Sequence, residues 1–228
     1  MTLKILAVIP ARAGSKRLPG KNKKILNGKP MIVWTIEAAM KVKEISTVYV
    51  STDDPDIAEI SRASGAFVPD LRPSHLSQDS TGTIDVVRHI YQNTCGYDVI
   101  IILQPTSPLR TAIDIDNAIE IYKKNNAESV ISITECEHKI GWSNYLDDDL
   151  CLNEFLSSAY SDPESRTGYR LNGAIYIFDA KKLEEDSFNL YDENSYGYLM
   201  DRVSSIDIDY IEDFEYAEFC MKKNVKAH

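Results

Sequence analysis

The sequence lacks the features by which small secreted proteins and membrane proteins are stabilised. None of its apolar runs approaches the roughly 18 residues that a membrane span needs. Residues 1–10 have neither the long apolar run nor the cleavage site of a signal peptide. The four cysteines are too far apart for a zinc or redox motif, so we expect free thiols in a cytoplasmic protein: Cys95, Cys136, Cys151 and Cys220. With 228 residues, the chain can bury a core of its own as one domain, 1–228.

Basic charge is scarce in the chain as a whole but dense at its start. Lys and Arg number 25 against 35 Asp and Glu, which gives a net charge of −10 and argues against binding to nucleic acid or to an anionic membrane. The first carboxylate is Glu37. Eight basic residues precede it: Lys4, Arg12, Lys16, Arg17, Lys21, Lys23, Lys24 and Lys29. This asymmetry fits a local anion site, or alternatively a solvated basic face.

Helical and strand patterns alternate along the first 133 residues. Short apolar or β-branched runs predict strands at residues 4–10, 47–52, 66–69, 98–104 and 129–133. Helical spacing predicts helices at residues 30–43, 54–64, 83–93 and 112–125. Such alternation is typical of parallel strands joined by crossover helices, so we expect a three-layer α/β/α sandwich with a mostly parallel sheet. After a polar stretch at about residues 135–168, strands are predicted at 169–178 and 203–209, and a closing helix at 211–224.

A loop rich in glycine and basic residues follows the first predicted strand. It reads IPARAGSKRLPGKN over residues 9–22, with Arg12, Lys16 and Lys21 spaced around Gly14. Loops at the carboxyl ends of parallel strands bind ligands in α/β folds, and glycine lets backbone N–H groups approach an anion. Three spaced cations suit a triphosphate. Neither the Walker pattern nor GxGxxG is present. The alternative is a surface loop with solvated lysines.

Two later segments carry polar groups suited to a ligand. Residues 103–110 read LQPTSPLR, in which two prolines stiffen a loop that carries Gln104 and Arg110. Residues 205–209 read SIDID, and in the strand predicted there Asp207 and Asp209 share a face. Adjacent carboxylates repel unless a cation lies between them, and hard oxygen ligands suit Mg²⁺. A solvent-facing edge strand is the alternative.

These segments together resemble a known family. IPARAGSKRLPGKN, LQPTSPLR, SIDID and RLNGAIY at residues 170–176 are similar to the signatures of the sialic-acid-type cytidylyltransferases, the CMP-sugar synthetases that activate nonulosonic acids for glycan biosynthesis. The resemblance covers about residues 3–133 and 169–218. It implies a Rossmann-like nucleotide-binding sheet with a small insertion at about residues 135–168, which serves as a sugar-side and dimerisation flap.

The resemblance also assigns residues to ligands. It implies nucleotide contacts for Arg12, Gly14, Ser15, Lys16, Lys21, Asn22, Arg72 and Thr83. It implies sugar contacts for Gln104, Arg170 and Asn172, with Arg166 and Lys139 as candidates for the sugar carboxylate because residues 135–168 depart from the family pattern. Asp207 and Asp209 would hold Mg²⁺, or Mn²⁺ in practice, and would act in catalysis together with Lys21.

The function expected on this basis is the coupling of CTP to the anomeric hydroxyl of a nonulosonic acid, with release of pyrophosphate. No histidine motif offers a general base, so a metal-assisted deprotonation is expected. A homodimer is also expected. Two alternatives stay open at this point: a nucleotidylyltransferase for another sugar or sugar phosphate, and a non-catalytic nucleotide-binding module.

Overall fold

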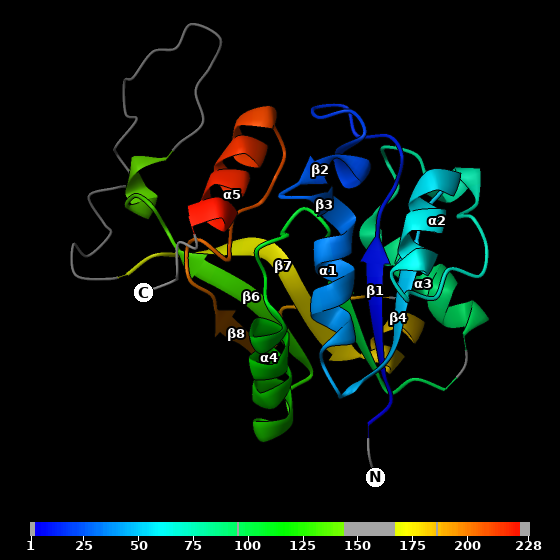
Figure 1. Cartoon of the computed structure of the whole chain (residues 1–228). Helices are drawn as coiled ribbons and strands as arrows, with labels where there is room; N and C mark the ends of the chain where they lie inside the picture. The colour runs from blue at the N-terminus through cyan, green and yellow to red at the C-terminus, as the bar shows by residue number, and fades with distance from the viewer. Residues whose placement is uncertain (1–2, 95, 144–166, 186, 224–228) are drawn as a thin grey trace, which may run out of the picture.

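A single six-stranded sheet forms the centre of the protein, seen in a computed structural model that describes residues 3–94, 96–143, 167–185 and 187–223 (Figure 1). The strand order is β4-β1-β5-β7-β6-β8. The strands span β1 Ile5–Pro10, β4 Ile45–Ser51, β5 Val99–Leu103, β6 Ser129–Glu135, β7 Tyr169–Asp179 and β8 Ser195–Leu199. Every residue of β5 is buried, as expected for a strand covered on both faces.

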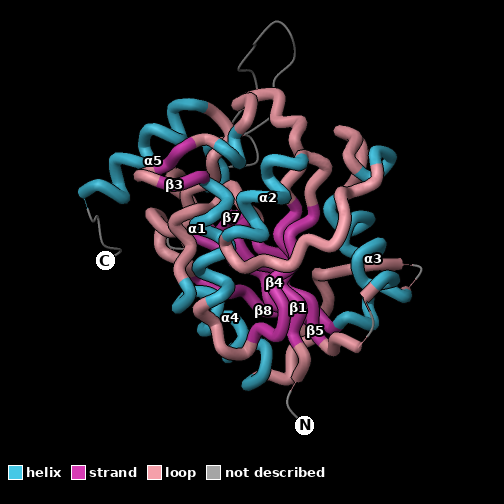
Figure 2. Tube along the Cα trace, turned by 45° about the vertical axis from the view of Figure 1, so that its right-hand side comes forward, coloured by secondary structure: helices cyan, strands magenta, loops and turns pink. Residues whose placement is uncertain are grey.

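Helices cover both faces of the sheet, which confirms the predicted three-layer sandwich. One face packs against α1 (Met31–Met40), α2 (Pro55–Ala63) and α4 (Ala112–Lys124). The other packs against α3 (Thr83–Asn93) and the 3₁₀ helix η5 (Ala180–Glu184). In the turned view of Figure 2, α3 lies across the strands from α1 and α4. Within the described ranges, no helix combines the length and apolar character that crossing a bilayer requires.

Strand β7 runs against the direction of the others. It pairs antiparallel with both β5 and β6, whereas the remaining pairs, β1 with β4, β1 with β5 and β6 with β8, are parallel. The ladder between β6 and β7 shifts register between Ile131 and Ile133. Gly173, opposite this shift, has φ of +75°, a conformation that favours glycine. The sheet is therefore mostly parallel, as predicted, with a bulged antiparallel strand at its centre.

Two local predictions need correction, and two elements were missed. The strand expected at residues 203–209 is wrong, because residues 202–205 form a turn and residues 206–209 belong to no strand. Asp201 accounts for the turn, since its Oδ1 accepts the backbone N–H groups of Val203 (2.8 Å) and Ser204 (3.0 Å). At residues 66–69 there is only an isolated bridge from Phe67 to Tyr49. Strand β8 and the β2–β3 hairpin were not predicted, although Asn27 and Gly28, both at positive φ, form the hairpin turn between β2 (Ile25–Leu26) and β3 (Lys29–Pro30).

The predicted insertion at residues 135–168 connects the paired strands β6 and β7. Glu135 pairs with Tyr169, and the N–H of Cys136 donates to the carbonyl of Gly168 over 2.9 Å. A 3₁₀ helix, η3 (Ile140–Trp142), follows β6. Residues 144–166 lie outside the described part of the chain, so the role of the insertion stays a prediction.

A small apolar cluster joins the N-terminal loop to the C-terminal segment. Leu18 and Leu26 pack with Met31, Ile208 and Phe214, the last of which belongs to α5 (Ile211–Lys223). Residues nearly 200 positions apart in sequence are thereby brought together at one end of the sheet. This cluster places Lys21 of the loop beside the SIDID segment.

Candidate active site

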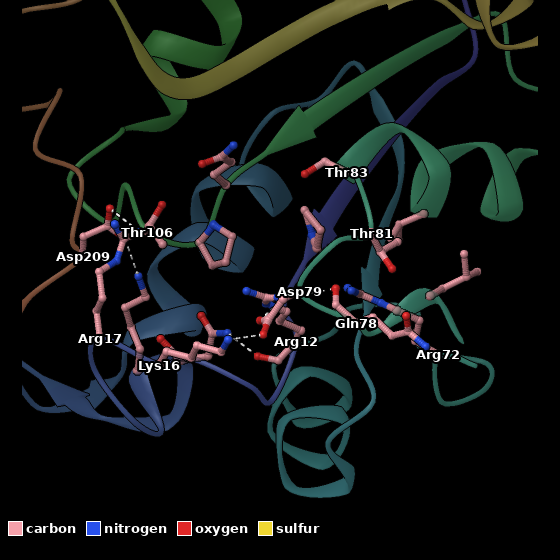
Figure 3. Close-up of a pocket in the computed structure, with 18 residues that line it drawn as sticks. Arg12, Lys16, Arg17, Arg72, Gln78, Asp79, Thr81, Thr83, Thr106 and Asp209 are labelled. Carbon is pink, nitrogen blue, oxygen red and sulfur yellow. Dashed lines mark hydrogen bonds and ion pairs between the residues drawn. The ribbon is translucent and has the colours of Figure 1, made fainter. Parts of the chain in front are cut away.

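A cavity of about 730 Å³ opens at the carboxyl ends of β1 and β5, the edge where α/β folds bind ligands (Figure 3). The loop after β1, the stretch between residues 72 and 83, the loop after β5 and the SIDID segment line it. Nine of the predicted site residues meet there: Arg12, Ser15, Lys16, Lys21, Asn22, Arg72, Thr83, Gln104 and Asp209. Four segments that are remote in sequence thus form one site.

The loop at residues 11–22, called the basic loop below, is fixed at its start by hydrogen bonds from its backbone N–H groups to β4 and to the loop after β4. The N–H of Ala11 donates to the carbonyl of Ser51, and the N–H of Ala13 donates to Asp53 Oδ1, each over 2.8 Å. Gly20, at φ of +67°, allows the turn before the 3₁₀ helix that carries Lys21. Gly14 is exposed at an ordinary φ and does not line the cavity, so its predicted contact with phosphate stays a prediction.

Asp79 pairs with two of the predicted phosphate ligands. Its carboxylate accepts Arg12 Nη1 at 3.0 Å and also contacts Lys16 Nζ. The hydrogen bond from Lys16 and the positive charge of Arg12 lower the pKa of Asp79. In Figure 3 the side chains of Arg12, Lys16 and Asp79 converge on the cavity. The sequence pointed to Arg72 and Thr83 on either side of Asp79 but not to this carboxylate itself, with which a bound phosphate would compete for Arg12 and Lys16.

Other residues that line the cavity carry groups suited to a nucleobase and a ribose. Arg72 is buried and donates from Nε to Ser51 Oγ (2.9 Å) and from Nη2 to the carbonyl of Ser51 (2.5 Å). Burial lowers the pKa of Arg72. Asn22 donates to the carbonyl of Arg12 over 3.2 Å, whereas its buried Oδ1 has no partner among the described residues. That orphaned acceptor, together with Thr83, is available to a ligand.

Asp209 is held by two cations. Lys21 Nζ lies 3.1 Å from Oδ1, and Arg17 Nη2 lies 2.7 Å from Oδ2. Lys21 also donates to the carbonyl of Ile208 over 2.5 Å. The Arg17 guanidinium lies 5.4 Å from the centre of the Tyr210 ring. Arg17 lines the cavity but was predicted only as part of the basic run, because its partners are about 190 residues away in sequence.

Asp207 lies near Asp209 but does not line the cavity. Asp207 is exposed, yet desolvation by the groups around its carboxylate raises its pKa, and the negative charges of Asp209 and Asp213 add to the rise, while Thr106 and Lys21 oppose it. A divalent cation would relieve this repulsion. No group of three metal-ligating side chains gathers in the described ranges, and two carboxylates suit an Mg²⁺ that takes its other ligands from phosphate and water. The donor set therefore fits the metal.

The predicted sugar ligands are more scattered. Gln104 lines the cavity, but Arg170 and Lys139 do not. Arg170 forms a two-pronged pair with Glu137, at 2.6 Å (Nη2 to Oε1) and 3.0 Å (Nε to Oε2), which lowers the pKa of Glu137 to about 2. Lys139 lies 5.9 Å from the centre of the Trp142 ring.

Asn172 serves the interior of the fold in this structure. It is 3% exposed, its Oδ1 accepts from Ser132 Oγ (2.5 Å) and its Nδ2 donates to Ser205 Oγ (2.9 Å). Arg166 lies outside the described residues. The nucleotide side of the predicted site is therefore assembled, and the sugar side is represented at the cavity by Gln104.

The sequence is similar to several characterised proteins. The profile of the cytidylyltransferase family matches residues 6–220. A CMP-N,N'-diacetyllegionaminic acid synthase from Legionella pneumophila is 38% identical, with 99% of both chains covered. A pseudaminic acid cytidylyltransferase from Campylobacter jejuni is 31% identical over 97% of this chain and 98% of its own. An N-acylneuraminate cytidylyltransferase from Escherichia coli is 35% identical over 95% of this chain, which spans only 52% of that protein.

Solved structures agree on the fold. A CMP:2-keto-3-deoxy-manno-octonic acid synthetase complexed with CTP superposes with a TM-score of 0.71 over 97% of this chain and 99% of its own, at 18% identity. A 4-diphosphocytidyl-2C-methyl-D-erythritol synthase from Anaerococcus prevotii gives a TM-score of 0.68 over 96% of both chains, at 17% identity.

Proposed function

The chain belongs to the cytidylyltransferase family and is a nucleotidyltransferase, and on that premise we propose that it couples CTP to the anomeric hydroxyl of a nonulosonic acid. The observation that carries this proposal is the cavity at the carboxyl ends of β1 and β5, whose lining combines three cations with Arg72, Thr83 and the unpaired Oδ1 of Asn22. The names of its relatives, which use legionaminic, pseudaminic and neuraminic acids, point to this class of acceptor.

The reaction needs charge neutralisation and alignment more than covalent help. The sugar hydroxyl attacks the α-phosphorus and loses its proton, a new O–P bond forms, and the bond to the β-phosphate oxygen breaks to release pyrophosphate. Arg12, Lys16 and Lys21 would hold the triphosphate after Asp79 yields the first two. Arg72 and Thr83 would contact the cytosine.

Asp207 and Asp209 would hold Mg²⁺, or Mn²⁺ in its place. When bound, the metal supplies charge neutralisation and acidifies the attacking hydroxyl. Before it binds, Asp209 must give up at least part of its pairing with Arg17 and Lys21. On the sugar side, Gln104 would contact the acceptor. Arg170 would reach the sugar carboxylate only by leaving Glu137, and Lys139, Arg166 and Asn172 are its other proposed ligands.

Pyrophosphate release tests the function directly. The purified protein is assayed with CTP and Mg²⁺ against N,N'-diacetyllegionaminate, pseudaminate and N-acetylneuraminate, with UTP and no-sugar controls. We expect release with CTP and one of the three acids, and a CMP-sugar in equal amount by mass spectrometry. Release with UTP as fast as with CTP, or silence with all three acids, would contradict the proposal.

We also propose a homodimer in the cytoplasm. The 3₁₀ helix η3 and the start of β7 expose apolar side chains that suit an interface, namely Ile140 (55% exposed), Trp142 (59%) and Leu171 (49%). Cys136 and Cys220 are free thiols, which suits a reducing compartment. Sedimentation equilibrium should give twice the 25.7 kDa chain mass, and the Trp142→Glu variant should shift it toward one chain mass. A wild-type monomer at micromolar concentration would refute the dimer.

A further inference from the structure

A buried arginine lies behind the cavity, in the loop that joins β5 to α4. Arg110 is 2% exposed. A single nitrogen, Nη1, donates to the carbonyl of Gln104 over 3.1 Å and to the carbonyl of Ala174 over 2.9 Å. Gln104 follows directly on β5 and lines the cavity, while Ala174 belongs to β7. Arg110 therefore joins the end of β5 to β7 at the point where Gln104 enters the cavity.

The two hydrogen bonds of Arg110 come at the cost of burying a charge and two unpaired donors. Its Nε and Nη2 are buried without hydrogen-bond partners among the described residues. Desolvation lowers the pKa of Arg110 to about 9, and Asp114 is the nearby charge that opposes the shift. Buried charges and unpaired donors are costly, and well-packed apolar side chains often replace them with no loss of stability. An arginine at this position is therefore better explained by what it holds in place.

The side chain of Gln104 is confined from the β7 side as well. Gly173 adopts φ of +75°, and a Cβ atom built there would lie 3.3 Å from Gln104 Oε1. The carbonyl of Gln104 also accepts the N–H of Ser107 over 3.3 Å. The side-chain amide of Gln104 thus lies against the backbone of Gly173. The backbone carbonyl of Gln104 is held by Arg110 and by the N–H of Ser107. Small movements of β5 relative to β7 would move this amide within the cavity.

We propose that Arg110 is a positioning residue that holds Gln104 for the acceptor sugar. This inference rests on the proposed function, because it assigns the sugar side of the cavity to Gln104. Arg110 itself does not touch the substrate. Arg110 acts on the reaction through the side-chain amide of Gln104. Its loss should therefore weaken binding of the acceptor sugar and leave the binding of CTP largely unchanged.

The matched variants are Arg110→Met and Arg110→Lys. Methionine removes both hydrogen bonds to the carbonyls, so we expect KM for the acceptor to rise by about ten-fold while Kd for CTP changes less than about three-fold. Lysine has one terminal nitrogen with three donors, which can serve both carbonyls without the two unpaired groups of arginine. Arg110→Lys should therefore keep KM close to the wild-type value. Arg62→Met is the control, since Arg62 caps the carbonyl of Val68 (2.9 Å) away from the cavity.

A double-mutant cycle with Gln104→Ala separates positioning from a general structural role. If Arg110 acts through the Gln104 side chain, Arg110→Met should raise KM in the wild-type background but not in the Gln104→Ala background. A wild-type KM in Arg110→Met, equal losses for CTP and sugar, or additive effects in the cycle would each overturn the inference. If Arg110→Met fails to fold, Arg110→Gln takes its place in the cycle with the same expectation.

The wild-type assay separates the two proposals. A wild-type protein that releases pyrophosphate with none of the acids contradicts the proposed function, and the inference with it. If the wild-type protein is active and Arg110→Met has the same KM for the acceptor, only the role of Arg110 is contradicted.

Discussion

Replacing Asp209 by asparagine should abolish most turnover while leaving the protein folded. Asp209 is the one carboxylate of the SIDID segment that lines the cavity. The variant keeps the shape of the side chain but removes the negative charge that would hold a divalent metal against the triphosphate. Loss of one preorganised electrostatic group typically costs about 10²–10³-fold in kcat, so we expect at least that decrease in steady-state assays.

The fold should tolerate Asp209→Asn because its ion pair with Arg17 is partly exposed, and because the buried Lys21 keeps the carbonyl of Ile208 as a partner. The Asp209 side chain is 32% exposed and that of Arg17 is 55% exposed, and such pairs contribute little to stability. The matched control is Glu212→Gln, an exposed acid three residues away in the first turn of α5. A further readout is the binding of Mn²⁺ by electron paramagnetic resonance, which Asp209→Asn should weaken. A variant with kcat within three-fold of wild type would rule out Asp209 as a metal ligand.

Replacing Lys21 by alanine should weaken the use of CTP by one or more powers of ten. The Lys21 side chain is 9% exposed, and its ammonium binds the carbonyl of Ile208 and the carboxylate of Asp209 at the edge of the cavity. Hydrogen bonds to charged groups contribute about 1.5–3 kcal/mol, which corresponds to roughly ten-fold or more in Kd for CTP. Isothermal titration with CTP, without acceptor, measures this loss.

Lys21→Ala has a second expected effect, because Lys21 also links the basic loop to the SIDID segment. Without it, Asp209 keeps Arg17 as its ion-pair partner in the described structure, so we expect a modest fall in melting temperature beside the loss of affinity. The control is Lys24→Ala, because this exposed lysine follows the basic loop and does not line the cavity. Unchanged Kd and KM for CTP in Lys21→Ala would refute its role with phosphate.

The elements that the sequence predicted well are those with local signals. The helix at residues 83–93 agrees with α3, and the apolar run at residues 98–104 contains β5. The hairpin at Asn27 and Gly28 was not predicted, although an Asn-Gly pair is itself a local signal for a tight turn. Strand β8 is different, because it is defined by pairing with β6, about 66 residues earlier, and its own residues are largely exposed. Its sequence, SYGYL, has two tyrosines at alternate positions but a glycine between them, which weakens the strand signal.

The gathering of the predicted nucleotide ligands at one cavity was predictable for the same reason. Most of its cations lie on one continuous loop after a recognisable strand, and the carboxyl end of a parallel strand is a known place for ligands. The sugar-binding residues were harder to predict. Arg170 carries the expected charge, but it is paired with the carboxylate of Glu137. Asn172 forms hydrogen bonds within the core. Local sequence shows which groups are present and does not show which neighbours already satisfy them.

The sequence by itself determined the class of fold and the family, and it predicted a phosphate-binding role for the loop at residues 9–22. Only the tertiary structure decided that Asp79 pairs with Arg12 and Lys16, that Arg17 and Lys21 share Asp209, and that Asp207 lies outside the cavity. It also placed Arg110, which the sequence suggested only as a loop cation, beneath Gln104. The physical reason is that hydrophobic period and turn chemistry are local, whereas ion pairing and desolvation depend on distances between residues that are remote along the chain.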